Sequence, residues 1–192
     1  MNTLKAEKRS MDVKAKKLRR EGFVTGNLFG REIEGSIPLK FTKKEIEVLL
    51  KNNNKGSQVM LELDGKTYDA LIKEVDYNPL AHTVEEVDFQ ALVSNEMVHS
   101  TAEIILENEE KVMSGVLQDE LKEVAYKALP ADLVDKIKVD VAGMKIGDTL
   151  RVKDLEIAKN KNIHITTDPE AVVATVTPVH LSLIHISEPT RP

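Results

Sequence analysis

The chain of 192 residues contains no cysteine and no tryptophan, and only 4% of its residues are aromatic. The absence of cysteine excludes disulfides, thiolate nucleophiles and structural zinc sites built on cysteine. No stretch approaches the roughly 20 apolar residues that a membrane-spanning helix needs. The charged start is not followed by the apolar run of a secretory signal. These absences predict a soluble protein of the cell interior.

Charge is distributed unevenly along the chain, which has a formal net charge of -5. Residues 1–24 hold eight basic and three acidic side chains, a net charge of +5, whereas residues 25–95 sum to -4 and residues 96–192 to -6. Net negative charge already favours solubility, so positive charge concentrated in one segment indicates an anionic partner that is met there. The basic side chains of this segment are Lys5, Lys8, Arg9, Lys14, Lys16, Lys17, Arg19 and Arg20.

The first half of the chain has the alternating apolar pattern of short β-strands. Residues 35–41 alternate, and residues 83–93 form another strand-like run. The pattern of residues 57–75 predicts a hairpin, because the Asp64-Gly65 pair between two alternating runs supplies the positive φ angles of a tight turn.

A short helix is predicted between these strands. Thr42 and Glu45 have the spacing of a capping box, and apolar residues at helical spacing follow before an asparagine-rich stop near residue 53. Five or six short strands with one or two helices in the first 93 residues predict a small closed or partly open barrel.

The second half is also rich in predicted strands. They fall within residues 100–110, 136–155 and 162–178, which are punctuated by glycine and proline. Residues 115–130 are ambiguous, because their apolar side chains fit both a helix and an alternating strand. We favour a strand that ends at Pro130.

The predicted fold is mostly β with short helices. It consists of an N-terminal small β-barrel (residues 1–93) followed by a β-rich C-terminal domain (residues 97–178). The final stretch, residues 181–192, fits neither domain and resembles the translated read-through of a cloning adapter. We therefore expect this tail to be non-native, with a natural disordered tail as the alternative.

The basic segment is the main electrostatic feature. If a helical turn begins near Lys16, then Arg19 and Arg20 follow at i+3 and i+4 and lie on the same face. Such a cluster suits phosphate groups, and nucleic acid is the favoured partner. A simple solvated helix is the alternative, and a membrane surface is disfavoured because few large apolar groups are available for insertion.

The sequence gives little support for an enzymatic function. No histidine pair has metal-binding spacing, no serine has the setting of a nucleophile, and no phosphate-binding loop is present. We therefore predict no catalytic site, no metal and no cofactor. A hydrolase that uses the carboxylates of Glu85, Glu86 and Asp88 is a weak third hypothesis. The five scattered histidines are His82, His99, His164, His180 and His185.

Several spaced motifs give the chain a family likeness over residues 3–178. They include "LKAEKR", the basic "KAKKLRREGFV", "LFG" and "LIKEVDYNPLAHTVEEVDFQALV" in the first half. The second half adds "GVLQDELKEV", "ALPADLVDKIKVDVAGMKIGDTLRVKDL" and "ITTDPEAVVATVTP". The sequence resembles the large-subunit ribosomal protein twenty-five family, especially its two-domain form, the CTC general stress protein.

This resemblance implies a structural, non-enzymatic protein of the bacterial large subunit. Such proteins bind 5S rRNA through the N-terminal barrel, assemble into the central protuberance and contact neighbouring ribosomal proteins. It also implies a cytoplasmic, ribosome-associated protein without a membrane or small-molecule partner. The RNA-binding positions implied by the resemblance are Arg9, Lys14, Lys16, Lys17, Arg19, Arg20, Phe29, Gly30 and Asp88.

Three departures from the family pattern are visible. One is a shorter loop from Ser10 to Lys14, together with "TG" at residues 25–26 in place of the usual Pro-Ala. The other two are single positions. Phe29 stands where the family usually has tyrosine, which keeps a stacking surface but loses a hydroxyl donor. Glu86 stands where the family has histidine, which places a negative charge beside RNA. The alternative hypothesis is therefore a stress-associated protein-interaction module with weakened RNA binding.

Overall fold

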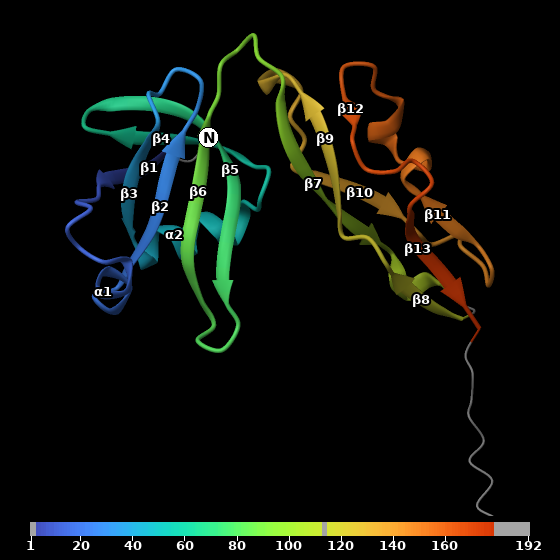
Figure 1. Ribbon diagram of the computed structural model, residues 1–192. Helices are drawn as coiled ribbons and strands as arrows, with labels where there is room; N and C mark the ends of the chain where they lie inside the picture. Colours follow the sequence, from blue (N-terminus) through green and yellow to red (C-terminus); the bar gives the residue numbers. More distant parts are fainter. Residues whose placement is uncertain (1–2, 113–114, 179–192) are drawn as a thin grey trace, which may run out of the picture.

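The computed structural model describes residues 3–112 and 115–178, and the predicted non-native tail lies outside them. The structure is mostly β, as predicted, with a barrel followed by a second β-rich region (Figure 1). The first six strands close the barrel in the order β1-β3-β2-β6-β5-β4. They are β1 (Thr3–Lys8), β2 (Phe23–Phe29), β3 (Ser36–Thr42), β4 (Gln58–Leu63), β5 (Lys66–Asn78) and β6 (Thr83–Ala91).

Alternating apolar residues fill the inside of this barrel. The rings of Phe41 and Phe89 lie 5.4 Å apart between their centroids in a tilted arrangement, and both side chains are buried. Barrel closure comes from β1, which runs parallel to β4 with Leu4 opposite Leu61. The strands predicted in the first 93 residues therefore form a closed barrel rather than a partly open one.

Two local predictions in this region are confirmed. Helix α2 (Lys43–Asn52) begins with the capping box of Thr42 and Glu45, and it buries Ile46 and Leu49 in the barrel core. Strands β4 and β5 form the predicted hairpin, in which Asp64 and Gly65 both have positive φ angles, 51° and 76°.

The second region contains two sheets, with strand orders β10-β7-β9-β12 and β11-β13-β8. Its core includes buried Tyr126, whose hydroxyl donates to the Val134 carbonyl at 2.6 Å and accepts from the Val134 N–H at 2.7 Å. The strands are β7 (Val98–Glu107), β8 (Val116–Asp119), β9 (Glu123–Ala128), β10 (Lys136–Asp140), β11 (Thr149–Arg151), β12 (His164–Ile165) and β13 (Val172–Thr177). The 3₁₀ helices are η1 (Glu109–Lys111), η2 (Pro130–Asp132), η3 (Val152–Asp154) and η4 (Glu156–Lys159).

The ambiguous segment 115–130 is extended, as we favoured, but it forms two strands rather than one. Strand β8 pairs with β13 in one sheet and β9 pairs with β7 in the other. Between them the backbone N–H groups of Glu120 and Leu121 both donate to the Val173 carbonyl. The chain leaves one sheet there and enters the other, so the alternation of Val124, Tyr126 and Ala128 belongs to β9 alone.

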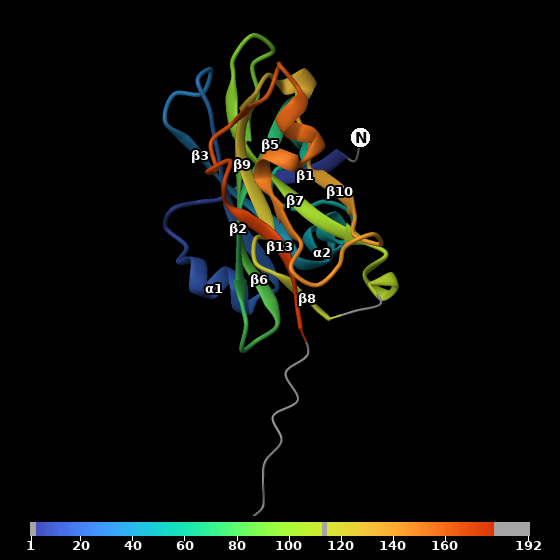
Figure 2. The ribbon, with the colours of Figure 1, turned by 90° about the vertical axis from the view of Figure 1, so that its right-hand side faces the viewer.

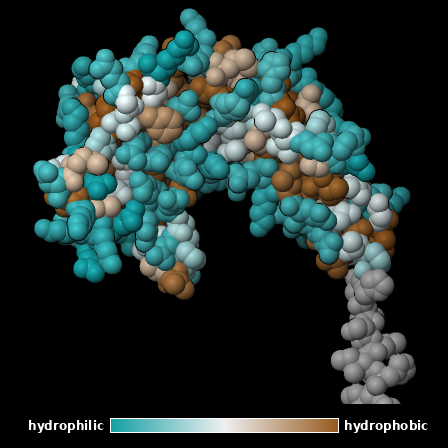
Figure 3. Space-filling view, viewed as in Figure 1, coloured by the Kyte–Doolittle hydropathy of each residue, from teal (hydrophilic) through white to brown (hydrophobic). Residues whose placement is uncertain are grey.

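A short polar junction connects the barrel to the second region. Lys73 donates to the His99 carbonyl at 2.7 Å, and the Ser57 hydroxyl donates to the Asp135 carboxylate at 3.2 Å. Gly56 has a φ of +89°, and a Cβ atom there would lie 1.9 Å from the Thr101 carbonyl oxygen. Only glycine allows this approach, so the backbone itself sets the spacing of the two regions. Away from the junction the molecule is arched (Figure 3).

Candidate nucleic-acid interface

Helix α1 (Ala15–Arg20) carries the predicted cluster of cations. It buries Leu18 and exposes Lys16, Lys17 and Arg20. Two views place the helix beside the barrel, near the ends of β2 and β6 (Figures 1 and 2). The predicted helical turn is therefore present, and its apolar residue anchors the cations to a rigid support.

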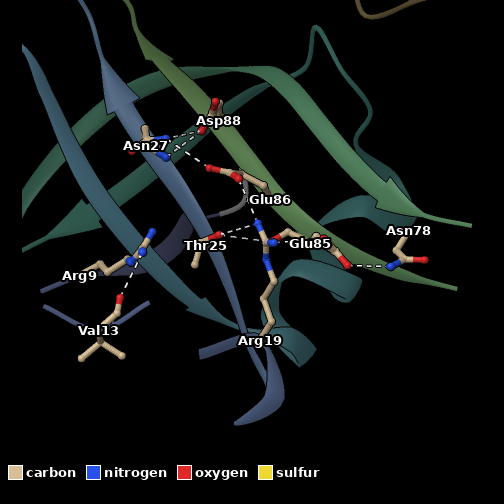
Figure 4. Close-up of polar contacts among 9 residues, drawn as sticks. All are labelled: Arg9, Val13, Arg19, Thr25, Asn27, Asn78, Glu85, Glu86 and Asp88. Atoms are coloured by element: carbon tan, nitrogen blue, oxygen red, sulfur yellow. Dashed lines mark hydrogen bonds and ion pairs between the residues drawn. The ribbon is translucent and has the colours of Figure 1, made fainter. Parts of the chain in front are cut away.

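Arg19 differs from its helical neighbours because its guanidinium points at strand β6 (Figure 4). Its Nε donates to the Glu85 carbonyl, and its Nη1 donates to the Glu85 carboxylate, each at 3.1 Å. Its Nη2 donates to the Glu86 carboxylate at 3.1 Å and to the Thr25 hydroxyl at 3.4 Å. The side chain is 30% exposed. Two charge-assisted contacts thus tie α1 to the barrel wall.

The hydrogen-bond network continues along the outer face of the barrel to Asp88. Its carboxylate accepts from the Asn27 backbone N–H at 2.9 Å and from the Asn27 side-chain amide at 3.1 Å. The same amide donates to Glu86 at 3.4 Å. These bonds hold the carboxylate of Asp88 on the outside of the parallel β2-β6 pair.

Carboxylates face each other across the neighbouring pair of strands. Glu86 lies opposite Asp76, and Asp88 lies opposite Glu74 in the β5-β6 register. Like charges opposite one another are unfavourable in a sheet. The outer face of β5 and β6 is therefore acidic, next to the basic surface of α1.

Arg9 organises the loop that leads into α1. Its Nη2 donates to the Val13 carbonyl at 3.2 Å, and its backbone N–H donates to the Pro38 carbonyl at 2.9 Å. Its Nε is buried without a hydrogen-bond partner among the described residues. Arg9 is thus partly committed to the protein, whereas Lys14, at the N-cap of α1, is exposed.

The remaining predicted contacts, Phe29 and Gly30, lie away from the helix. Phe29 ends β2, whereas Phe23 begins it beside α1. Seven residues of strand separate the two ends by roughly 20 Å. The structure therefore brings Lys16, Arg19 and Arg20 together and leaves the Phe29-Gly30 pair as a separate point on the barrel.

A pocket of about 400 Å³ opens where α1 meets the barrel. Lys16, Arg19 and Arg20 line it, together with Phe23 and Lys43, which the sequence did not single out. Phe23 lies within the motif "KAKKLRREGFV", but only the basic side chains of that motif were assigned a role, and no quoted motif contains Lys43. The only available signal was the position of Lys43 directly after the helix cap, a weak indication by itself.

No metal centre or membrane-spanning helix is evident in the parts of the chain that the structure describes. Within residues 3–112 and 115–178, no three His, Cys, Asp or Glu side chains are grouped to hold a metal ion. No helix in these ranges is long and apolar enough to cross a bilayer.

Comparison with known proteins gives matches over both halves of the chain. The model described as the Ribosomal L25p family matches residues 4–89, and that described as Ribosomal protein TL5, C-terminal domain, matches residues 97–180. Three relatives share the name large ribosomal subunit protein bL25. The relative in Carboxydothermus hydrogenoformans is 32% identical over 179 residues, 88% of each chain. The relative in Bacillus velezensis is 31% identical over 183 residues, 93% of this chain and 89% of that protein. The relative in Thermoanaerobacter sp. is 29% identical over 164 residues, 84% of this chain and 81% of that protein.

These matches cover 84% to 93% of this chain and 81% to 89% of the relatives. They agree with the two-part architecture, in which the barrel and the second β-rich region follow one another in the same order. The resemblance inferred from the sequence motifs is therefore confirmed, and the chain belongs to the ribosomal L25p family.

Proposed function

We propose that this protein is a structural, non-catalytic component of the large ribosomal subunit that acts in translation by binding 5S rRNA. Its relatives carry the name of a large-subunit protein. The observation that carries the RNA-binding proposal is helix α1, which holds exposed Lys16, Lys17 and Arg20 against the closed barrel. Phosphate contacts of this kind position a protein on RNA.

The barrel offers a rigid surface for an RNA helix. RNA has a wide, shallow minor groove that proteins recognise through shape, 2′-hydroxyls and phosphates. In this proposal the exposed cations of α1 and Lys14 meet phosphates, while Asp88 and Phe29 meet the groove from the barrel wall. Arg9 and Arg19 support the basic segment through their contacts within the protein.

The acidic second region fits a different task. Residues 96–192 carry a net charge of -6, which disfavours contact with phosphates. We propose that this region meets neighbouring large-subunit proteins rather than 5S rRNA, so that the whole protein is ribosome-associated. No small-molecule substrate or membrane is part of the proposal.

Binding to a 5S transcript across a range of salt concentrations tests the RNA-binding proposal. If about four cations meet phosphates, the logarithm of the binding constant should fall with the logarithm of salt concentration with a slope of about -3. An unrelated RNA duplex of equal length is the control. Equal affinity for the two RNAs, together with absence from salt-washed large subunits, would contradict the proposal.

A second candidate function is a protein-interaction module with weakened RNA binding. It is favoured by the pairing of Arg19 with Glu85 and Glu86, which neutralises one cation of α1. The acidic row on β5 and β6 points the same way, because it repels phosphates. In that case the protein would sediment with large subunits even after 5S rRNA is removed.

A further inference from the structure

The pocket beside α1 is built from four elements that meet at one end of the barrel. Helix α1, the first residues of β2, the first residue of α2 and the first residues of β6 all contribute to it. Its volume of about 400 Å³ is in the range of pockets that hold small ligands. The site is therefore a concave feature of the wall rather than an extension of the flat basic surface.

The charge of the pocket is strongly positive. Lys16, Arg20 and Lys43 border it in addition to Arg19. Among the described residues, the only acidic side chain in the lining is Glu85, which already accepts from Arg19 and, at 2.7 Å, from the amide of Asn78. Lys43 also lies 3.8 Å from the carboxylate of Glu47, an exposed residue of the same helix that is outside the lining. The remaining three cations still leave an excess of positive charge in the lining, so the pocket is complementary to a phosphate group.

The lining also contains an aromatic ring. Phe23 is half-buried and borders the pocket with Val24 and Val84. The Lys40 ammonium lies 5.1 Å from the centroid of this ring. Aromatic rings beside positive charge are the elements with which proteins bind unstacked bases of single-stranded RNA.

We propose that this pocket holds one unstacked nucleotide of the bound RNA, with its phosphate between Lys16, Arg20 and Lys43 and its base against Phe23. The inference rests on the proposed function and adds to it that one nucleotide of the RNA is bound in this pocket. A base inside a continuous duplex is stacked and out of reach, so the nucleotide must come from a bulge, a loop or an end. A free mononucleotide has the same chemistry, and the experiments separate the two sources.

The charge contribution is tested by a matched pair of lysines on α2. Lys43 lines the pocket, whereas Lys44 follows it directly, is exposed and lies outside the pocket. Lys43→Ala should lower the affinity for 5S rRNA severalfold and make the salt slope less steep by about 0.7 to 0.9, the loss of one phosphate contact. Lys44→Ala should change neither quantity. Equal effects of the two substitutions would overturn the proposal.

The stacking contribution is tested with a single introduced tryptophan, since the chain contains none of its own. Tryptophan fluorescence in Phe23→Trp should be quenched by 5S rRNA and by a short single-stranded oligoribonucleotide, but not by an abasic oligonucleotide of equal length. Val116→Trp, at an exposed position of β8, is the control and should not respond. Circular dichroism verifies that both variants are folded.

Three further results would each overturn the assignment. They are quenching by adenosine 5′-monophosphate without quenching by RNA, equal competition by poly-glutamate, and no response of Phe23→Trp while 5S rRNA binds. Phe23→Leu keeps an apolar side chain and should lower RNA affinity about fivefold or more, the loss of one stacked base. If the wild-type protein fails to bind 5S rRNA, the proposed function itself is contradicted. If it binds while the Phe23 and Lys43 variants behave as wild type, only the pocket proposal is contradicted.

Discussion

The guanidinium of Arg19 and the carboxylate of Glu86 form an ion pair at 3.1 Å that joins helix α1 to strand β6. The two residues are 67 positions apart in the sequence. Glu85 pairs with the same guanidinium at 3.1 Å. The family resemblance implied that Arg19 binds RNA, but its guanidinium is held by the two carboxylates of Glu85 and Glu86 within the protein.

Replacing Glu86 by histidine should raise the affinity for 5S rRNA. The substitution removes a negative charge from the surface that we propose to face RNA and leaves Arg19 paired with Glu85 alone. We expect a gain of several-fold in a filter-binding or fluorescence titration at low salt. Glu110→His, at an exposed position of the second region, makes the same change of charge and should have no effect. An unchanged affinity in Glu86→His would place position 86 outside the interface.

Substitutions of Arg19 and Arg20 should have different effects on the stability of the protein and on its RNA binding. Arg19→Ala removes several hydrogen bonds at a partly buried site and should lower the free energy of unfolding by about 1 to 2 kcal/mol. Arg20 is exposed, so Arg20→Ala should change stability by less than about 0.5 kcal/mol. Urea unfolding of both variants measures the difference.

The salt dependence of RNA binding should rank the two substitutions in the opposite order: Arg20→Ala should change the slope more than Arg19→Ala does. Arg20→Ala should make the slope less steep, because an exposed cation that meets a phosphate is lost. Arg19→Ala should weaken binding without an equal change in slope, because the guanidinium is already paired within the protein. A flatter slope for Arg19→Ala than for Arg20→Ala would show that Arg19 leaves its carboxylates to meet RNA.

Gly56→Ala should disturb the junction of the two regions. The new Cβ would meet the Thr101 carbonyl oxygen at 1.9 Å, and the φ of +89° is strained for alanine. Gly65 is a matched control, because its φ is +76° but a Cβ atom there would have no described atom within 4 Å beyond its chain neighbours. Gly65→Ala should cost only the strain, about 1 to 2 kcal/mol, and Gly56→Ala should cost more. Small-angle X-ray scattering should show a changed radius of gyration for Gly56→Ala alone, and an unchanged one would argue against a role of this contact in spacing.

His99 should titrate below the ordinary range of a histidine. His99 is largely exposed, but partial desolvation of its ring lowers its pKa, and the positive charges of Lys127 and Lys73 lower it further because they disfavour the imidazolium. The folded state then binds its proton less readily than the unfolded state. The stability contributed by neutral His99 should therefore be present above the unfolded pKa and be lost as the pH falls through the folded pKa.

An NMR titration of the histidine side chains measures this pKa directly. Lys127→Ala should raise the pKa of His99, because one of the two nearby cations is removed. Lys161→Ala, which removes an exposed cation elsewhere in the second region, should leave it unchanged. A pKa of His99 that stays the same in Lys127→Ala would contradict a contribution of Lys127 to the shift.

Local signals in the sequence predicted much of the barrel. The capping box of Thr42 and Glu45 and the Asp64-Gly65 turn depend on residues close together in the chain, so their patterns are readable from sequence. The split of residues 115–130 between two sheets was missed, because it depends on Val173 on a distant strand.

The candidate site was predictable only in part for the same reason. The helical turn with Lys16 and Arg20 follows from spacing within a single segment. The pairing of Arg19 with Glu86 brings together distant residues, and the pocket adds Lys43 from another helix. Sequence patterns identified the cations but not which of them the fold neutralises.

Closure of the barrel through β1 and β4 has a consequence for how this part of the molecule meets other molecules. Where the ring is closed, a strand has a neighbour on both sides, and its main-chain groups are paired across both borders. There an incoming chain has no open border on which to add a strand. Whatever associates with that part of the barrel must recognise outward side chains and loops, so selectivity can change at single surface positions while the interior stays intact.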